Sequence, residues 1–282
     1  MNPHRVGSVL RGVYTGSMTT VVRPRTTQQQ AVAAGAHVVL LVTLSACAGL
    51  GPVGLAAGLA YIVGLCALLT GAVRRAGVNS LGPADLVTLT RAVLVGAVTA
   101  IVTDAFWSDD TPVALLVVLA AIALALDAVD GQVARRSCTV SALGARFDME
   151  VDAFLVLVLS VYVATLVGPW VLAIGVMRYA FVAASWMAPW MRSALPTRYS
   201  AKTVAAWQGI ALVVAASQVL LLQLTVAVVV TALASLVWSF GRDVAWLWRH
   251  ADLPRVPELR GPATLTQTRT EGKFIAGRPD IG

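Results

Sequence analysis

Apolar segments dominate the chain and alternate with short polar loops. A membrane-spanning helix needs roughly 20 apolar residues, and eight segments approach or reach that length. They lie at 32–50, 53–73, 85–104, 111–133, 147–167, 170–190, 203–222 and 224–248. The first two form one apolar run interrupted by Gly51-Pro52, a dipeptide typical of a turn. The pattern therefore predicts an all-α polytopic membrane protein of about eight transmembrane helices, beginning with a hairpin.

The composition agrees with this prediction. Of 282 residues, 58% are hydrophobic and 12% are charged, whereas soluble domains carry about 25% charged residues. The net charge of +7 needs no nucleic acid, because loop cations next to anionic headgroups explain it. No basic stretch with interleaved aromatic residues suggests an RNA or DNA surface.

Lysine and arginine residues predict the orientation in the membrane. They occur before the first segment and after the second, fourth, sixth and eighth, whereas the alternate loops contain none. The positive-inside rule then places both termini, and the loop after the fourth segment, on the cytoplasmic side of the cell membrane. We expect four regions: a flexible basic arm at 1–30, a two-helix hairpin at 31–75, a six-helix catalytic domain at 76–250 and a poorly ordered tail at 251–282.

Five of the fourteen acidic residues fall between Asp127 and Asp152, next to strongly apolar segments. Acids so close to hydrocarbon are costly and usually mark a functional site. Asp127 and Asp130 are three residues apart, and Asp148 and Asp152 are four apart, so each pair lies on one helix face. The first pair ends one predicted helix and the second begins the next. A cytoplasmic turn between them would bring all four carboxylates together.

Four such carboxylates would repel one another unless they bound protons or metal ions. An all-oxygen ligand set selects hard cations, so we expect Mg²⁺ or Mn²⁺, and a pair of ions could clamp a transferring phosphoryl group. Gly131, Ala134 and Gly144 lie beside the acids and leave room for close approach by another group. Two other classes stay open at this point. Ion-coupled transporters also use intramembrane acids, and prenyltransferases use Asp-rich faces, although they commonly carry two such motifs and this chain has one.

Several polar residues outside the acid cluster also invite interpretation. Asp85, Thr88 and Arg91 share one helix face; helix-start chemistry explains Asp85 but not Arg91, which lies almost two turns in. Arg178 lies inside an apolar segment and needs a partner, which a phosphate or a central acid would provide. The remaining predictions concern His37, expected to be packed or solvated rather than a ligand, and three acids expected to be solvated surface charges, Asp104, Asp109 and Asp110.

The acid cluster resembles the signature of the CDP-alcohol phosphatidyltransferase family. Every specified position and spacing agrees, in Asp127-x2-Asp130-Gly131-x2-Ala134-Arg135-x8-Gly144-x3-Asp148-x3-Asp152. The resemblance covers about 80–250, so the first two helices look like an N-terminal addition. It implies a transfer in which an alcohol hydroxyl attacks the lipid-linked phosphoryl group of CDP-diacylglycerol and CMP leaves.

The resemblance also implies roles for individual residues. Metal ions, two in number, would be held by Asp127, Asp130 and Asp148, with Asp152 as the proton acceptor and a further metal contact. The CDP moiety would be contacted by Asp85, Thr88, Gly131, Ala134, Arg135, Ser141 and Gly144. Family members are often homodimers.

The acceptor alcohol is predicted from a second set of residues. Arg198, Lys202, Thr203 and Gln208 look like a pattern found in phosphatidylglycerophosphate synthases, whose acceptor is glycerol 3-phosphate. With Arg178, the residues Arg198 and Lys202 would bind the acceptor phosphate. We rank glycerol 3-phosphate first, and inositol phosphate or a lipid acceptor remain alternatives.

Overall fold

The computed structural model describes residues 25–77, 82–108, 110–137, 142–188 and 199–249, with side chains except at 25, 128–137, 142 and 199–202. This part of the chain forms eight α-helices and one 3₁₀ turn. They are α1 (Arg25–Ala48), α2 (Pro52–Ala76), α3 (Pro83–Asp104), α4 (Val113–Ser137), α5 (Ala142–Val167), η1 (Pro169–Val171), α6 (Leu172–Met187), α7 (Tyr199–Ala216) and α8 (Leu222–Arg249). Within these ranges there is no strand, so the predicted all-α fold is confirmed.

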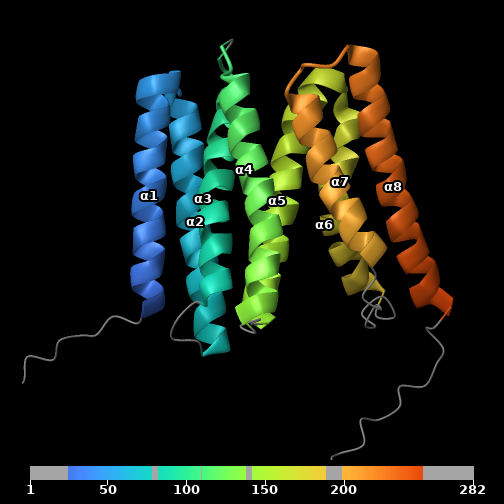
Figure 1. The fold of residues 1–282 in the computed structure, drawn as a ribbon, viewed down its shortest axis with the longest axis horizontal. Helices are drawn as coiled ribbons and strands as arrows, with labels where there is room; N and C mark the ends of the chain where they lie inside the picture. Colours follow the sequence, from blue (N-terminus) through green and yellow to red (C-terminus); the bar gives the residue numbers. More distant parts are fainter. Residues whose placement is uncertain (1–24, 78–81, 109, 138–141, 189–198, 250–282) are drawn as a thin grey trace, which may run out of the picture.

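The helices stand side by side along one direction, as expected for a bundle that crosses a bilayer (Figure 1). Six of them are long and apolar enough to span a membrane, and the segments Val113–Asp127 and Thr203–Ala216 form shorter apolar helices. The chain is therefore a multi-pass membrane protein.

Helix α3 is the centre of the first half of the bundle. It packs against α1, α2, α4 and α5. Within its most apolar window 67% of the residues are buried, compared with 17% for α1. The mean hydropathy of this window is 1.9 in α3 and 2.0 in α1, so mean hydropathy alone does not distinguish the central helix from a peripheral one.

Helix α1 begins several residues before the apolar segment that predicted it. Thr26 and Gln30 are buried in its first two turns, and the Thr70 hydroxyl of α2 donates to Gln30 Oε1 at 3.0 Å. The hydrogen bond between Thr70 and Gln30 extends the packing of α1 against α2 beyond the apolar segment of α1. Hydropathy cannot detect this extension, because it records only apolar residues.

Helices α4 and α5 also extend further toward each other than predicted. Helix α4 ends at Ser137 rather than near 133, and α5 begins at Ala142 rather than near 147. Alanine, arginine and glutamine favour helix even where the sequence is polar, so α4 and α5 extend beyond the apolar segments that predicted them. Asp127 and Asp148 therefore lie well inside regular helices and are held by their backbones.

His37 is packed between three helices, as predicted. Its side chain is fully buried, and its ring nitrogens lie 3.1 Å from the Val93 carbonyl oxygen and 3.0 Å from that of Gly58. Gly96 of α3 permits this packing, because a Cβ there would overlap the His37 ring.

Asp104 corrects a prediction. It was expected to be a solvated loop charge, yet it is only 8% exposed. Its carboxylate accepts hydrogen bonds from the backbone N–H groups of Gly51 at 2.9 Å and Gly54 at 3.1 Å. Asp104 thus caps the N-terminus of α2, where no local side chain does so. Asp110 is exposed as predicted, and Asp109 lies outside the described residues.

Replacing Asp104 with alanine is expected to lower the free energy of unfolding by about 1–2 kcal/mol, because two N–H groups of α2 lose their acceptor. Thermal unfolding in detergent, followed by tryptophan fluorescence, measures the change. The matched control is Asp110→Ala, which should shift stability by less than about 0.5 kcal/mol. Equal effects of the two substitutions would contradict the capping role.

Candidate functional site

Among the residues whose side chains are described, three acids from two helices converge on one buried arginine. Arg91 of α3 has a side chain with no solvent exposure. Its Nη1 lies 2.5 Å from Asp127 Oδ1, and its Nη2 lies 2.5 Å from Asp148 Oδ1 and 3.4 Å from Asp152 Oδ1. Nη2 also donates to the Asp148 carbonyl oxygen at 3.1 Å. The guanidinium therefore joins α3, α4 and α5 through charge-assisted contacts.

The acids are more open to solvent than the arginine behind them. The side chains of Asp127, Asp148 and Asp152 are 37%, 33% and 38% exposed. They belong to the half of the bundle in which α4 ends and α5 begins, with Asp127 ten residues before the end of α4 and Asp152 ten residues after the start of α5. A ligand arriving at this end meets carboxylate oxygens first, with the positive charge of Arg91 buried beneath them.

The backbone explains the arrangement. Asp148 and Asp152 are four residues apart on α5 and contact the same nitrogen of Arg91, as a shared helix face requires. Asp127 faces them from α4. Asp130, Gly131, Ala134 and Arg135 follow on α4, but their side chains are not among those described.

The donor set is chemically suited to a hard divalent cation. All three side chains offer carboxylate oxygens, and they already converge on a positive charge. Their spacing is set by a guanidinium, which is larger than a metal ion. Accordingly, within the described residues, which omit the Asp130 side chain, no group of three or more acid, histidine or cysteine side chains is arranged to hold a metal.

Comparison with known proteins identifies the family. The family model for CDP-alcohol phosphatidyltransferase matches residues 82–238, which is more than half of the chain. This chain belongs to the CDP-alcohol phosphatidyltransferase family. No curated protein and no solved structure matches it. Members of the family are enzymes of phospholipid synthesis that transfer a phosphatidyl group from a CDP-alcohol. The match begins at the N-cap of α3, so α1 and α2 precede the family domain.

Two other predicted site residues of this phosphatidyltransferase lie near the start of α3. Asp85 is 6% exposed, and its Oδ2 accepts a hydrogen bond from the Gly82 N–H at 2.9 Å. Thr88 is 3% exposed and donates to the Ala84 carbonyl oxygen at 3.3 Å. Asp85 is thus engaged in helix-start chemistry, whereas Arg91, on the same face, reaches the acid cluster. Gly144 is buried one turn before Asp148.

Arg178 finds its partner in Glu150, the fifth acid between Asp127 and Asp152, which belongs to neither of the spaced aspartate pairs. Its Nη2 donates to Glu150 Oε1 at 2.6 Å, and the two side chains are 33% and 57% exposed. Glu150 is two residues from Asp148 and so lies about 200° around α5 from it. The expectation that a central acid would serve is correct, but the acid is not one of the four aspartates.

The acceptor residues predicted near α7 divide into two groups. Arg198 lies outside the described residues, and the Lys202 side chain is not described. Gln208 is 2% exposed, and its Nε2 donates to the Ala232 carbonyl oxygen at 3.0 Å and to Ser235 Oγ at 3.2 Å. Gln208 therefore ties α7 to α8. The signal for this role was its position one turn beyond the polar start of α7, inside an apolar segment.

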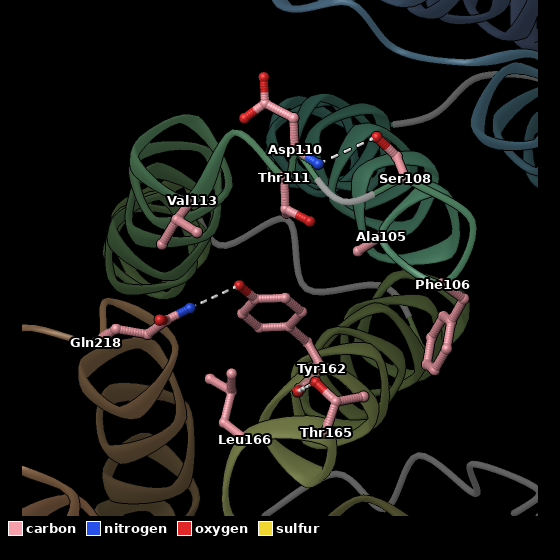
Figure 2. A pocket seen from close by; sticks show the side chains of 10 residues that line it. All are labelled: Ala105, Phe106, Ser108, Asp110, Thr111, Val113, Tyr162, Thr165, Leu166 and Gln218. Atoms are coloured by element: carbon pink, nitrogen blue, oxygen red, sulfur yellow. Dashed lines mark hydrogen bonds between the residues drawn. The ribbon is translucent and has the colours of Figure 1, made fainter.

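A cavity of about 450 Å³ lies at the opposite end of the bundle (Figure 2). Tyr162 and Gln218 lie across it, and Gln218 Nε2 donates to the Tyr162 hydroxyl at 3.0 Å. The carboxylate of Asp110 points away from Tyr162 (Figure 2). Asp110 is the one acid among the described residues that line this cavity, and it is turned outward, so these residues offer no carboxylate cluster like the one around Arg91.

Proposed function

We propose that this enzyme transfers a phosphatidyl group from CDP-diacylglycerol to a phosphorylated alcohol and releases CMP. One observation carries the proposal: carboxylates from α4 and α5 converge around a cation at an open end of the bundle, inside the segment that matches the family. A diphosphate needs concentrated positive charge, and clustered carboxylates are how proteins bind the hard cations that supply it.

Asp127, Asp130 and Asp148 would hold two divalent cations, Mg²⁺ or Mn²⁺, with a further contact from Asp152. Bound there, the cations would neutralise the diphosphate of the donor. The Arg91 guanidinium supports this assignment because it already brings Asp127 and Asp148 to one cation. The spacing that the guanidinium sets would have to contract for these acids to form a metal ligand shell.

Asp152 would accept the proton of the attacking hydroxyl. Its contact with Arg91 is the longest of the three, at 3.4 Å, and 38% of its side chain is exposed to solvent. The acceptor oxygen forms a bond to the phosphorus next to diacylglycerol, and the bond from that phosphorus to the CMP oxygen breaks. The proton moves to Asp152 and the electron pair leaves with CMP.

The CDP moiety would lie along the start of α3 and the α4–α5 end of the bundle. Residues proposed to border it are Asp85, Thr88, Gly131, Ala134, Arg135, Ser141 and Gly144. In support, Asp85 and Thr88 lie on the α3 face that carries Arg91, and Gly144 lies one turn before Asp148. Glycine and alanine let the backbone approach a ligand closely.

For the acceptor we favour glycerol 3-phosphate, bound through Arg178, Arg198 and Lys202. The Arg178–Glu150 ion pair is partly exposed and worth at most about 1 kcal/mol, so a phosphate dianion can compete for the arginine. The phosphate of inositol phosphate would bind the same three basic side chains. A lipid acceptor would depend less on them.

We also infer that residues 76–250 form the catalytic domain, with α1 and α2 as an accessory hairpin. The distribution of loop cations supports a cell-membrane protein whose termini and acid cluster face the cytoplasm. A homodimer is supported by the frequent occurrence of homodimers in the family.

An acceptor screen tests the function. Purified enzyme, Mn²⁺ and CDP-diacylglycerol are incubated with glycerol 3-phosphate, inositol phosphate, unphosphorylated polyols or phosphatidylglycerol, and CMP release is measured. We expect release with glycerol 3-phosphate to exceed that with the unphosphorylated polyols. If none of these alcohols supports CMP release, the proposed transferase function is wrong and the alternative function, ion-coupled transport, is favoured.

Removal of divalent cations should stop the reaction. With excess EDTA we expect CMP release to fall by more than about 100-fold, because the diphosphate charge is no longer neutralised. Adding Mg²⁺ or Mn²⁺ in excess of the chelator should restore the rate, whereas adding Na⁺ at matched ionic strength should not. Full activity in EDTA would contradict the metal assignment.

A further inference from the structure

A groove of about 1,000 Å³ runs between α2 and α5, with Tyr179 of α6 at its edge. It exists because α2 and α5 both pack against α3 but touch each other only sparsely. The α2 side of the groove is lined by small residues, Ala60, Gly64 and Ala72, which leave space for a ligand. The α5 side is lined by Phe147 and Val151.

The groove is closed at one end and charged at the other. Tyr61 of α2 and Phe154 of α5 meet with ring centroids 5.5 Å apart, and the Tyr61 hydroxyl is anchored on the Ala92 carbonyl oxygen at 2.9 Å. Arg75 and Arg146 line the opposite end, where α2 finishes and α5 starts. Both arginines are exposed, and neither forms an ion pair with any residue whose side chain is described.

The length of the groove matches one leaflet. Tyr61 and Arg75 are fourteen residues apart, which corresponds to about 21 Å along a helix. One leaflet is about 20–22 Å thick when its headgroup region is included, so the groove reaches from the headgroup level to the bilayer centre. At this depth an apolar, laterally open groove is filled by hydrocarbon and not by water.

We propose that this groove binds an anionic phospholipid of the adjacent leaflet, with one acyl chain along Leu68, Phe147 and Val151. Its phosphate would lie between Arg75 and Arg146, where two cations that pair with none of the described acids complement a negative headgroup. The Glu150 carboxylate also lines the groove, and one carboxylate against the two arginines leaves this end net positive.

The lipid site is separate from the acid cluster. The groove-lining residues Phe147, Val151 and Phe154 lie on a different face of α5 from Asp148 and Asp152. One wall is α2, which lies outside the segment that matches the family. The proposal therefore does not depend on the proposed reaction.

Filling the groove tests the proposal. Gly64 lines the groove and a Cβ added there would meet nothing within 4 Å, so Gly64→Phe can begin a side chain at the groove wall without a clash at Cβ. Loss of a helical glycine also favours folding. The matched control is Gly35→Phe on α1, where a Cβ also meets nothing within 4 Å and which lies outside the groove. Both proteins are purified in detergent and photolabelled with phosphatidylglycerol that carries a diazirine on one acyl chain.

In the unmodified protein we expect labelled peptides from 60–76 and 143–154. Gly64→Phe should reduce this labelling about tenfold, because displacing two methylene groups from apolar contact costs about that factor in affinity. Gly35→Phe should leave it unchanged. The double variant Arg75→Ala/Arg146→Ala should lose its preference for phosphatidylglycerol over phosphatidylcholine.

Labelling that is unchanged in Gly64→Phe, or that maps to other helices, would overturn the lipid site. The lipid site would also be overturned if a second copy of the chain covered the groove. In that case labelling would appear only after the protein is diluted to the monomer. Asp152→Asn should label normally, so failure of the reaction and failure of the lipid site give different results.

Discussion

Replacing Asp152 with asparagine is expected to lower CMP release by about 10³-fold or more while largely preserving metal-dependent binding of CDP. The amide has the shape of the carboxylate but cannot accept the proton of the attacking hydroxyl, and loss of a general base costs about 10²–10⁴-fold. The structure favours this separation of effects, because Asp152 has the longest contact with Arg91 of the three acids. Steady-state CMP release and equilibrium binding of CDP in Mn²⁺ provide the two measurements.

Asp127→Asn is the informative comparison. Asp127 lies 2.5 Å from Arg91 and is assigned to metal binding, so this variant should lose CDP binding as well as turnover. Asp110→Asn, an exposed acid at the other end of the bundle, should change neither. Equal loss of CDP binding in Asp152→Asn and Asp127→Asn would argue against Asp152 as the base.

Replacing Arg91 with methionine is expected to lower the free energy of unfolding by about 3 kcal/mol. Breaking a buried ion pair by removing one partner costs about 3–5 kcal/mol, and the partial exposure of the three carboxylates favours the lower value. Without the guanidinium, three like charges lose the cation on which they converge. Arg91→Lys should recover only part of the loss, because an ammonium cannot span carboxylates on both sides as a planar fork does.

Divalent cations distinguish this explanation from a simple packing defect. Mn²⁺ should raise the unfolding temperature of Arg91→Met more than that of the unmodified protein, since it supplies the missing positive charge. Thermal unfolding in detergent, with Mn²⁺ or with EDTA, measures the difference. Unchanged stability of Arg91→Met in EDTA would show that the acid cluster does not hold α3, α4 and α5 together.

The fold class and the number of helices could be predicted because hydropathy and length are local properties of the chain. The acid cluster was also predictable in part. Spacings of three and four residues put carboxylates on one helix face whatever the tertiary structure, and a short connection brings two such faces together. The match of 82–238 to the phosphatidyltransferase family agrees with the resemblance first seen in the spacing of those acids.

Long-range partners were less predictable. Asp104 was expected in solvent because it ends an apolar segment, but its partners, Gly51 and Gly54, precede it by about fifty residues. Arg91 had two readings at the sequence level, and only its contacts with α4 and α5 favour the functional one. Glu150 belongs to neither spaced pair of aspartates, so no partner was predicted for it, yet it binds Arg178 of α6.

The sequence by itself determined a helical membrane bundle with a carboxylate pair on each of two neighbouring helices, because helix period and bilayer thickness act residue by residue. Only the tertiary structure decided what lies between those pairs and beside them. Packing on α3 places the Arg91 guanidinium against three acids, and the same packing holds α2 and α5 apart as a groove. Both features depend on which helices become neighbours, and that choice is made by side-chain contacts between segments far apart in the chain.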